Sequence, residues 1–360
     1  MIRLSAPSVG EEEIEAVTAV LRSGQLAQGP EVAAFEAAFA HLVDGRPCVA
    51  VNAGTSGLQL ALMALGIGPG DEVVVPSFTF AGTANAVRLA GAEPVFADIE
   101  GETFGLDPEA VAAAITPRTA AVMPVHLYGH PARMAELTEV ARRHQVALVE
   151  DAAQAHGASL AGRPVGAFGD AAVFSFYATK NMTTGEGGMV VLTDEAALRR
   201  LKLLRNQGME RQYENEIVGF NMRMTDVAAA IGRVQLGRLD ERNARRRANA
   251  TVLDEALGDV VITPAVAPGA VHVYHQYTVR TPRRDELQAG LAELGVEARV
   301  FYPVPVDLLT PYRGSAARAA GVLTETDRAA GEVLSLPVGP HLSDEDVSRV
   351  AEGVLKVLAG

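Results

Sequence analysis

The sequence contains little that would suit an oxidising or membrane environment. Cys48 is its only cysteine, which excludes an intrachain disulfide and a cysteine-based zinc site. No apolar run is long enough to span a bilayer. The opening stretch, MIRLSAPSVGEEEIEAV, has no apolar signal core and turns acidic by Glu11. We therefore expect a soluble, cytoplasmic protein that has no membrane partner.

Positive charge is scarce as well. The 360 residues include 31 lysines and arginines against 44 acidic residues, giving a net charge of -13 and a pI near 5.1. This balance argues against a general nucleic-acid binder. The one basic run, Arg242 with Arg245, Arg246 and Arg247, is interpreted as the solvated face of a long helix. Because 48% of the residues are hydrophobic and 21% are charged, we expect a large buried core.

Several familiar catalytic signatures are missing or incomplete. The chain has no G-x-S-x-G elbow and no P-loop lysine pattern. The glycines within 66–70 precede a strand-like run instead of following one, so they predict a turn and not a dinucleotide-binding loop. The pairs His126/His130 and His272/His275 lack a third ligand at suitable spacing, so we predict no metal site.

Strand-like runs alternate with helical patterns through most of the chain, with no internal repeat. The seven runs lie at 48–54, 71–78, 93–100, 119–129, 146–153, 171–180 and 187–194. Runs that are apolar on both faces and separated by helices predict a largely parallel sheet with helical crossovers. The last two runs are joined by a short glycine-rich link, which predicts one antiparallel pairing.

The pattern changes near Asn243. A long charged helix leads to HVYHQYTVR, then to the helix DELQAGLAELG, a strand over 296–303 and the final helix SDEDVSRVAEGVLKVLAG. We therefore predict a large α/β domain over residues 1–242 and a smaller α+β domain over residues 243–360.

Candidate ligand-binding residues follow several of the strand-like runs. In an open α/β sheet, ligands bind beyond the carboxyl ends of the strands. Gly54, Thr55 and Ser56 follow the first run at a predicted helix start, where backbone N–H groups suit an anion, although an ordinary helix cap is the alternative. Asp151 lies near the end of the fifth run, where a carboxylate that is costly to bury either caps the following segment or pairs with a cation. Lys180 ends the sixth, among small, hydroxylated and aromatic residues.

With Phe80 and Ser175, which also lie at strand ends, these residues form the set that a pyridoxal phosphate (PLP) site needs. A lysine in such a site forms a Schiff base, and desolvation lowers its pKa so that it acts as nucleophile and base. A carboxylate keeps the pyridine nitrogen protonated, so that the ring accepts electrons. An aromatic side chain stacks on the ring, and donors at a helix terminus hold the phosphate.

The motifs that contain these residues resemble those of the PLP-dependent sugar aminotransferases of the DegT/DnrJ/EryC1/StrS family. They follow one another along nearly the whole chain: QGPEVAAFE, NAGTSGLQLAL, PGDEVVVPSFTF, PVHLYG, VEDAAQAHGA, SFYATKNMTTGEGGM, GFNMRMTDVAAAIG, HVYHQYTVR, FYPVPV and SLPVGP. The resemblance implies an aspartate-aminotransferase-like α/β fold (PLP fold type I), with a mostly parallel seven-stranded sheet in the large domain. It also implies an obligate homodimer.

The resemblance assigns roles to individual residues. Lys180 would carry the cofactor and Asp151 would pair with the pyridinium nitrogen. Gln154 would lie near the phenolic oxygen, and Phe80 would stack on the ring, where many relatives have Trp or Tyr. The phosphate would be bound by Gly54, Thr55, Ser56, Ser175 and, from the other subunit of the dimer, Asn221. Candidate substrate contacts are His126, with shaping of the crevice as its alternative, and Asn181, Glu186 and Tyr302.

Lysine at position 180 indicates transamination, because the dehydratases of this family carry histidine there. The segment TTGEGG at 183–188 is typical of relatives that aminate C4 of a sugar, whereas C3 aminotransferases tend to have L-G-x-x-G-D-x-G. We therefore expect amino transfer from L-glutamate to a nucleotide-linked 4-keto-6-deoxyhexose, for polysaccharide or natural-product biosynthesis. Three alternatives stay open: a keto-cyclitol such as scyllo-inosose, C3 of a keto-sugar, and a PLP-binding regulatory protein without catalysis.

Overall fold

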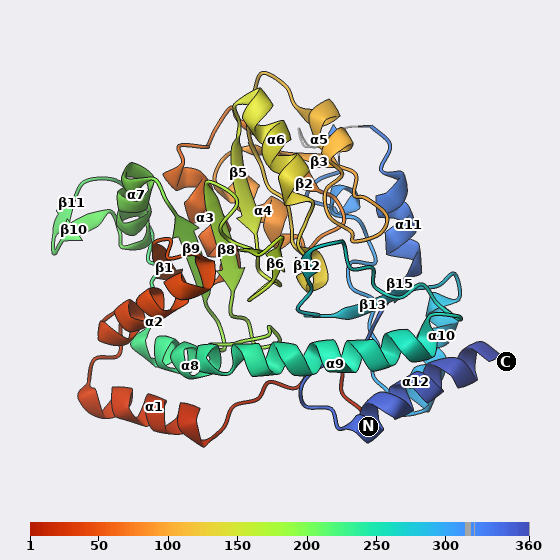
Figure 1. Ribbon diagram of the computed structural model, residues 1–360. Coiled ribbons are helices and arrows are strands. Elements are labelled where there is room, and N and C mark those ends of the chain that lie inside the picture. The colour runs from red at the N-terminus through yellow and green to blue at the C-terminus, as the bar shows by residue number, and fades with distance from the viewer. Residues whose placement is uncertain (314–317, 320, 360) are drawn as a thin grey trace.

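The computed structural model describes residues 1–313, 318, 319 and 321–359, and it shows an α/β architecture around one large sheet (Figure 1). In spatial order the strands are β1 (Cys48–Val51), β9 (Gly188–Leu192), β8 (Ala171–Ser175), β5 (Ala147–Asp151), β4 (Thr119–Val122), β2 (Glu72–Pro76), β3 (Glu93–Ala97) and β14 (Arg318–Ala319). The seven predicted strands are all present, so the prediction of a mostly parallel sheet is confirmed. The short β14 is an addition.

Among the described strands of this sheet, β9 alone runs against its neighbours. It pairs antiparallel with β8 and with β1, and these registers place Gly188 opposite both Ser175 and Val51. The pairings from β8 across to β14 are parallel. The predicted antiparallel pairing of β8 with β9 is therefore present, and a second one arises because β1 lies beyond β9.

Helices cover both faces of the sheet, which explains why the strands from β1 to β9 that belong to it are buried along almost their whole length (Figure 1). One face carries α3 (Gly54–Ala64), α4 (Gly82–Leu89) and α7 (Glu195–Arg205), and the other carries α2 (Pro30–Ala40), α5 (Pro108–Ala114), α6 (Met134–His144) and α8 (Asp226–Gly237). Strand alternation divides the side chains between these layers. Val173 packs in the first layer, whereas Phe174 packs against Phe39 in the second.

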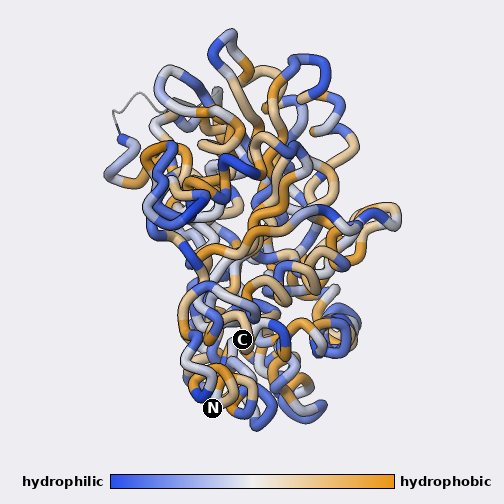
Figure 2. Tube along the Cα trace, turned by 90° about the vertical axis from the view of Figure 1, so that its left-hand side faces the viewer, coloured by the Kyte–Doolittle hydropathy of each residue, from blue (hydrophilic) through white to orange (hydrophobic). Residues whose placement is uncertain are grey.

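A smaller core lies beside the sheet and holds both ends of the chain (Figures 1 and 2). It contains the antiparallel pair β13 (Tyr277–Arg280) and β15 (Val333–Leu336) with α9 (Leu239–Leu257), α10 (Arg284–Glu293) and α12 (Asp344–Ala359). Two segments cross the predicted boundary at residue 242. Ile2 bridges to Val296 in the small core, whereas Val306, Tyr312 and Leu323 pack in the core of the large sheet. The domain limits themselves stay a prediction.

The remaining elements are short or peripheral. They are α1 (Glu11–Ser23), α11 (Thr324–Glu332), the hairpin β10 (Met209–Arg211) with β11 (Glu214–Asn215), and the small sheet of β12 (Ala270–Val271), β6 (Ser159–Leu160) and β7 (Arg163–Pro164). Together, α8 and α9 form a long rod beneath the sheet (Figure 1).

The predicted strand over 296–303 is wrong. Only two isolated bridges form there, at Val296 and at Arg299. Tyr302 has a φ of 63°, in the left-handed region that a strand does not use, and Pro303 follows it without an N–H to donate. This segment is therefore shaped as a turn, and it places the Tyr302 hydroxyl against the side chain of Gln154.

The interpretation of the basic run as a solvated face is wrong for Arg246. This residue of α9 is 7% exposed, and its Nη1 donates to the carbonyl oxygens of Tyr274 (3.0 Å) and His275 (3.3 Å). Burial lowers the pKa of Arg246 to about 10, and the charge of Arg242 acts in the same direction. Arg246 therefore anchors the segment before β13 to the long helix.

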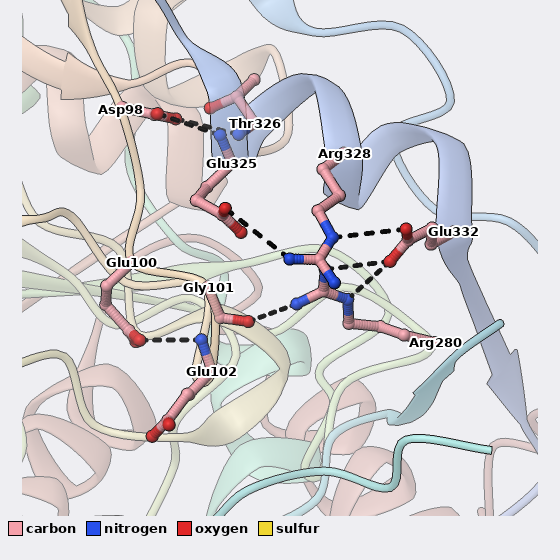
Figure 3. A network of polar contacts seen from close by, with 9 residues as sticks. All are labelled: Asp98, Glu100, Gly101, Glu102, Arg280, Glu325, Thr326, Arg328 and Glu332. Carbon is pink, nitrogen blue, oxygen red and sulfur yellow. Dashed lines mark hydrogen bonds and ion pairs between the residues drawn. The ribbon is translucent and has the colours of Figure 1, made fainter. Parts of the chain in front are cut away.

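A polar network joins the end of β3 to α11 and β13 (Figure 3). The carboxylate of Asp98 accepts the backbone N–H of Glu325 (3.0 Å) in the first turn of α11. Arg280 donates to the carbonyl oxygen of Gly101, and its Nη2 donates to Glu332 (2.9 Å). We call this cluster, together with Arg328, the junction, because it connects the loop after the large sheet to the smaller core.

Candidate active site

The predicted cofactor residues meet at the carboxyl edge of the sheet. Asp151 ends β5, Ser175 ends β8, and Lys180 follows β8 in a turn. Because β5 and β8 pair in parallel, both strands deliver their last residues to the same edge. Gly54 begins α3 and Phe80 precedes α4, and both helices pack behind this part of the sheet.

The N-terminus of α3 lies directly against Ser175. A Cβ added at Gly54 would lie 2.8 Å from the Cβ of Ser175, so this close approach requires glycine. No side chain caps the helix start. The hydroxyls of Thr55 and Ser56 therefore lie with those first N–H groups and with Ser175 at one end of the helix. Such an end, with its positive partial charge, fits a phosphate group.

Phe80 forms a wall beside this helix start. Its side chain is 60% exposed, whereas Phe78, on the same segment, is fully buried. A Cβ at Gly82 would lie 2.8 Å from the ring of Phe80 and 2.9 Å from Oγ1 of Thr55, so the ring and the hydroxyl adjoin. An exposed aromatic face next to an anion-binding helix terminus fits stacking on a flat ring.

Two adjacent carboxylates at the end of β5 point to opposite faces of the sheet. Glu150 is fully buried and accepts three backbone N–H groups, those of Gly166 (2.8 Å), Phe168 (2.8 Å) and Gly169 (2.7 Å). Burial acts to raise the pKa of Glu150, but the contact with His126 and these hydrogen bonds outweigh it and lower the pKa. The negative charge of Glu150 is therefore stabilised by hydrogen bonds within the protein, and its role is structural.

Asp151 has a different environment. It is 4% exposed, its Oδ2 accepts the hydroxyl of Thr83 (2.8 Å), and its Oδ1 accepts the N–H of Ala153 (3.2 Å). Burial raises the pKa of Asp151, against the hydrogen bonds from Thr83 and Ala153 and the positive charge of Lys180. A buried carboxylate in this state is stabilised by a cationic partner, which fits a protonated pyridine nitrogen.

Lys180 is half-buried in the turn after β8. Its backbone N–H donates to the carbonyl oxygen of Tyr177 (2.9 Å), which fixes the turn. Burial lowers the pKa of the Lys180 amine to about 8, with Asp151 acting in the opposite direction. An appreciable fraction of the amine is therefore uncharged near neutral pH, as a nucleophile requires.

Two of the four candidate substrate residues lie inside the protein. His126 is fully buried: its Nδ1 accepts the N–H of Ala132 (3.0 Å), and its Nε2 lies 3.1 Å from Glu150. Asn181 is 4% exposed and donates to Oδ1 of Asn243 (2.8 Å), among other partners. Their substrate roles stay predictions, and the contacts present are structural.

The other predicted residues lie at the surface or near Asp151. The side chains of Glu186 and Asn221 are exposed, and Asn221 lies in an extended segment that runs beside the end of β1. Tyr302 meets Gln154, whose Nε2 donates to the Tyr302 hydroxyl (2.9 Å). The structure therefore brings Gln154 and Tyr302 together, although the two come from distant parts of the sequence.

Sequence reasoning did not identify the contacts that three residues of this region make, although it placed Tyr128 with His126 as a candidate for sugar contact or for shaping the crevice. Thr83 holds Asp151, and its position in the first turn of the helix after Phe80 was a usable signal. Tyr128 holds Gln154 through its backbone N–H, for which the side-chain pattern contains no signal. His156, within VEDAAQAHGA, lies between aromatic rings, and burial followed by the charge of Lys180 lowers its pKa to about 3.

Comparisons with known proteins agree with this arrangement. Residues 7–355 match the DegT/DnrJ/EryC1/StrS aminotransferase family. The erythromycin biosynthesis sensory transduction protein EryC1 of Saccharopolyspora erythraea is 47% identical, over 93% of this chain and 92% of that protein. The dTDP-3-amino-3,4,6-trideoxy-alpha-D-glucose transaminase of Streptomyces venezuelae is 46% identical, over 94% and 90%.

A solved structure extends the match to three dimensions. The crystal structure of S. venezuelae DesV in complex with a ketimine intermediate superposes with a TM-score of 0.93 at 46% identity, covering 96% of this chain and 94% of that one. The predicted fold class is confirmed by this match. Within the described residues, no helix is both long and apolar enough to cross a membrane.

Proposed function

The chain belongs to the DegT/DnrJ/EryC1/StrS aminotransferase family, and from this premise we propose that it transfers an amino group from L-glutamate to a nucleotide-linked keto-deoxyhexose. That it is a PLP-dependent sugar aminotransferase follows from the family and the matched transaminases. The observation that carries the proposal is the convergence of Lys180, with its pKa near 8, and the buried Asp151 on one crevice.

Lys180 and Asp151 would have separate roles at the cofactor. PLP, when bound, supplies an aldehyde carbon and a ring that accepts electrons. Nζ of Lys180 would hold the cofactor at that carbon and, once the amino donor displaces it, would carry a proton between the donor and the same carbon. Asp151 would pair with the protonated ring nitrogen, and the hydroxyl of Thr83 would keep the carboxylate in place.

The phosphate end of the cofactor would be bound by the start of α3 with Thr55, Ser56 and Ser175. We propose in addition a homodimer in which Asn221 reaches the phosphate of the partner subunit. The exposed side chain of Asn221 supports this role. Asn221→Ala should then weaken PLP binding without changing the absorbance of the cofactor that remains bound.

The aminated carbon is the least constrained part of the proposal. The segment 183–188 favours C4, whereas the transaminase that is 46% identical is named for a 3-amino sugar. A panel of nucleotide-linked 3-keto and 4-keto deoxyhexoses, with scyllo-inosose as the cyclitol alternative, separates these substrates. The expected result is turnover with one of the nucleotide sugars and none with the cyclitol.

The first experiment is an absorbance spectrum of the purified protein with PLP, before and after L-glutamate is added. The visible band should disappear as the cofactor takes up the amino group. Borohydride reduction before glutamate should then fix PLP on one peptide, and the assignment is simple because the chain carries only three lysines, Lys180, Lys202 and Lys356. Attachment at Lys202 or Lys356 would contradict the proposal.

A second candidate function is regulation without catalysis. It is favoured by the name of the relative that is 47% identical, a sensory transduction protein. The two functions differ in one result. A regulatory protein would keep its visible band with every amino donor tested, whereas an aminotransferase loses it with at least one.

A further inference from the structure

We propose that Tyr302 is a positioning residue that fixes the side-chain amide of Gln154, so that one N–H of Gln154 is kept for the phenolic oxygen of PLP. This inference rests on the proposed cofactor site and adds to it a contact between two distant segments of the chain. Tyr302 was expected at the substrate entrance, but the structure places its hydroxyl 2.9 Å from Nε2 of Gln154.

The orientation of the Gln154 amide follows from its partners. Oε1 lies 2.7 Å from the backbone nitrogen of Tyr128, which can only donate, so this end of the amide must be the oxygen. The other end is therefore the NH₂ group, and one of its two N–H bonds is used by the hydroxyl of Tyr302. A second donor remains on the same nitrogen, at a residue that lies one turn beyond Asp151.

The hydroxyl of Tyr302 is itself held by packed rings. Its ring stacks on that of Tyr128, with centroids 6.4 Å apart and planes inclined by 10°. Phe78 meets the Tyr302 ring edge-on at 5.9 Å, and Phe104 packs against Tyr128 at 5.5 Å. The packed rings therefore hold the Tyr302 hydroxyl, while Tyr128 contacts the other end of the amide through its backbone N–H.

The backbone at both tyrosines is unusual. Tyr128 has a φ of 57° and Tyr302 a φ of 63°, in the left-handed region that aromatic residues seldom adopt. Such strained residues are often found at functional sites, where the surrounding structure holds them in place. Gly129 continues the strained turn at 97°, and a Cβ there would lie 3.1 Å from the carbonyl oxygen of Gln154. Two of the tyrosines with a positive φ therefore contact the side-chain amide of Gln154.

The protonation state of Tyr302 suits the role. Burial raises the pKa of Tyr302, and Asp151 acts in the same direction, against the hydrogen bond from Gln154. The hydroxyl therefore stays neutral near neutral pH, and it accepts from Nε2 without placing a second negative charge near the phenolic oxygen. A donor to that oxygen stabilises its negative charge, which makes the imine nitrogen of the bound cofactor less basic.

The test replaces Tyr302 with Phe and follows the visible band of the PLP-loaded protein as a function of pH. We expect the pH midpoint of the band to rise by about 0.5 unit or more, because the freed amide no longer holds its donor in place. Tyr277→Phe is the matched control. It also removes a hydroxyl from a buried tyrosine, one that donates to Asp254 (2.7 Å) in the smaller core, and it should lower stability without moving the midpoint.

A double-mutant cycle separates positioning from direct contact with the cofactor. If Tyr302 acts through Gln154, then Tyr302→Phe should cause no further shift in the Gln154→Ala protein. Equal shifts in both backgrounds would overturn the inference, as would a midpoint that Tyr302→Phe leaves unchanged. A wild-type protein that shows no visible band with PLP would overturn the proposed function as well, so the two failures are distinguishable.

Discussion

Charged side chains lie in the crevice around Lys180 and Asp151 and in the junction around Arg280. The two places differ in how these charges are paired. At the junction, the carboxylate of Glu332 forms ion pairs with Nη2 of Arg280 (2.9 Å) and with Nε of Arg328 (3.3 Å) (Figure 3). In the crevice, the contacts of Asp151 are a neutral hydroxyl and a backbone N–H. The arginines of the junction thus form direct ion pairs, whereas the charges of Asp151 and Lys180 act on each other without a direct ion pair among the described residues.

The difference shows how a buried charge can be assigned to structure or to function. A charge that finds its counter-ion within the fold positions the elements that carry it. A charge that is buried with weak partners has a shifted pKa, and binding a ligand of opposite charge relieves the cost of burial. Lys180, with its pKa lowered to about 8, and Asp151, with its pKa raised, both belong to the second class.

The largest effect is expected at Lys180. Lys180→Ala should slow the formation of 2-oxoglutarate from L-glutamate by at least about 10³-fold, because the nucleophile and the proton carrier are lost together. Lys202→Ala, at an exposed lysine of α7, is the control and should keep the wild-type rate. A Lys180→Ala protein with near-normal turnover would show that the crevice is not the active site.

The next effect separates the two carboxylates of β5. Asp151→Asn should slow the glutamate half-reaction by about 10²-fold or more, since the ring nitrogen loses its anionic partner, while stability is maintained. Glu150→Gln should instead lower stability and leave the rate of the half-reaction nearly unchanged. It leaves backbone donors facing an amide, so the free energy of unfolding should fall by about 2–4 kcal/mol while the rate per folded molecule changes little.

Chemical denaturation and 2-oxoglutarate formation measure the two quantities. Rate loss at both positions with unchanged stability would mean that strand alternation does not divide these acids by role. A loss of stability at Asp151 alone would instead place that residue among the structural anions.

Much of the sheet could be predicted because its strands are buried on both faces. Such strands appear in the sequence as continuous apolar runs, and the lysine and aspartate at their ends stand out against that background. The apolar run alone does not separate the roles of Glu150 and Asp151, and it was the family resemblance that assigned the cofactor contact to Asp151. Successive residues of a strand face opposite sides, and an acidic pair at the end of a run does not show which member faces the crevice.

The contact between Gln154 and Tyr302 could not be predicted from the sequence. It joins residues 148 positions apart, and it depends on a turn in a segment that has the composition of a strand. The two positive φ angles beside it occur at tyrosines, and Tyr is not a residue type that marks a left-handed turn in the sequence. The family resemblance identified both residues without identifying their contact.

A smaller effect concerns the pH dependence of PLP attachment to the cofactor-free protein. Only the uncharged amine attacks the aldehyde. For an amine with a pKa near 8, the uncharged fraction increases about tenfold between about pH 7 and pH 9. The rate constant should therefore rise over that range and then level off. For a lysine with an ordinary pKa, the uncharged fraction would still increase above that range. A rate constant that keeps rising to about pH 10 would therefore contradict the lowered pKa of Lys180.

The smallest effect on catalysis is expected at the junction. The Arg280 side chain is 7% exposed and donates from both Nε (3.1 Å) and Nη2 (2.9 Å) to Glu332. Arg280→Ala should therefore lower the free energy of unfolding by about 1–3 kcal/mol while changing the glutamate half-reaction by less than about threefold. Arg133→Ala is the control, because its ion pair with Glu136 is exposed, and its stability should stay within about 0.5 kcal/mol of wild type. If Arg280→Ala instead slowed the reaction strongly and left stability unchanged, the junction would belong to the working site, and the distinction between neutralised and unneutralised charge would fail.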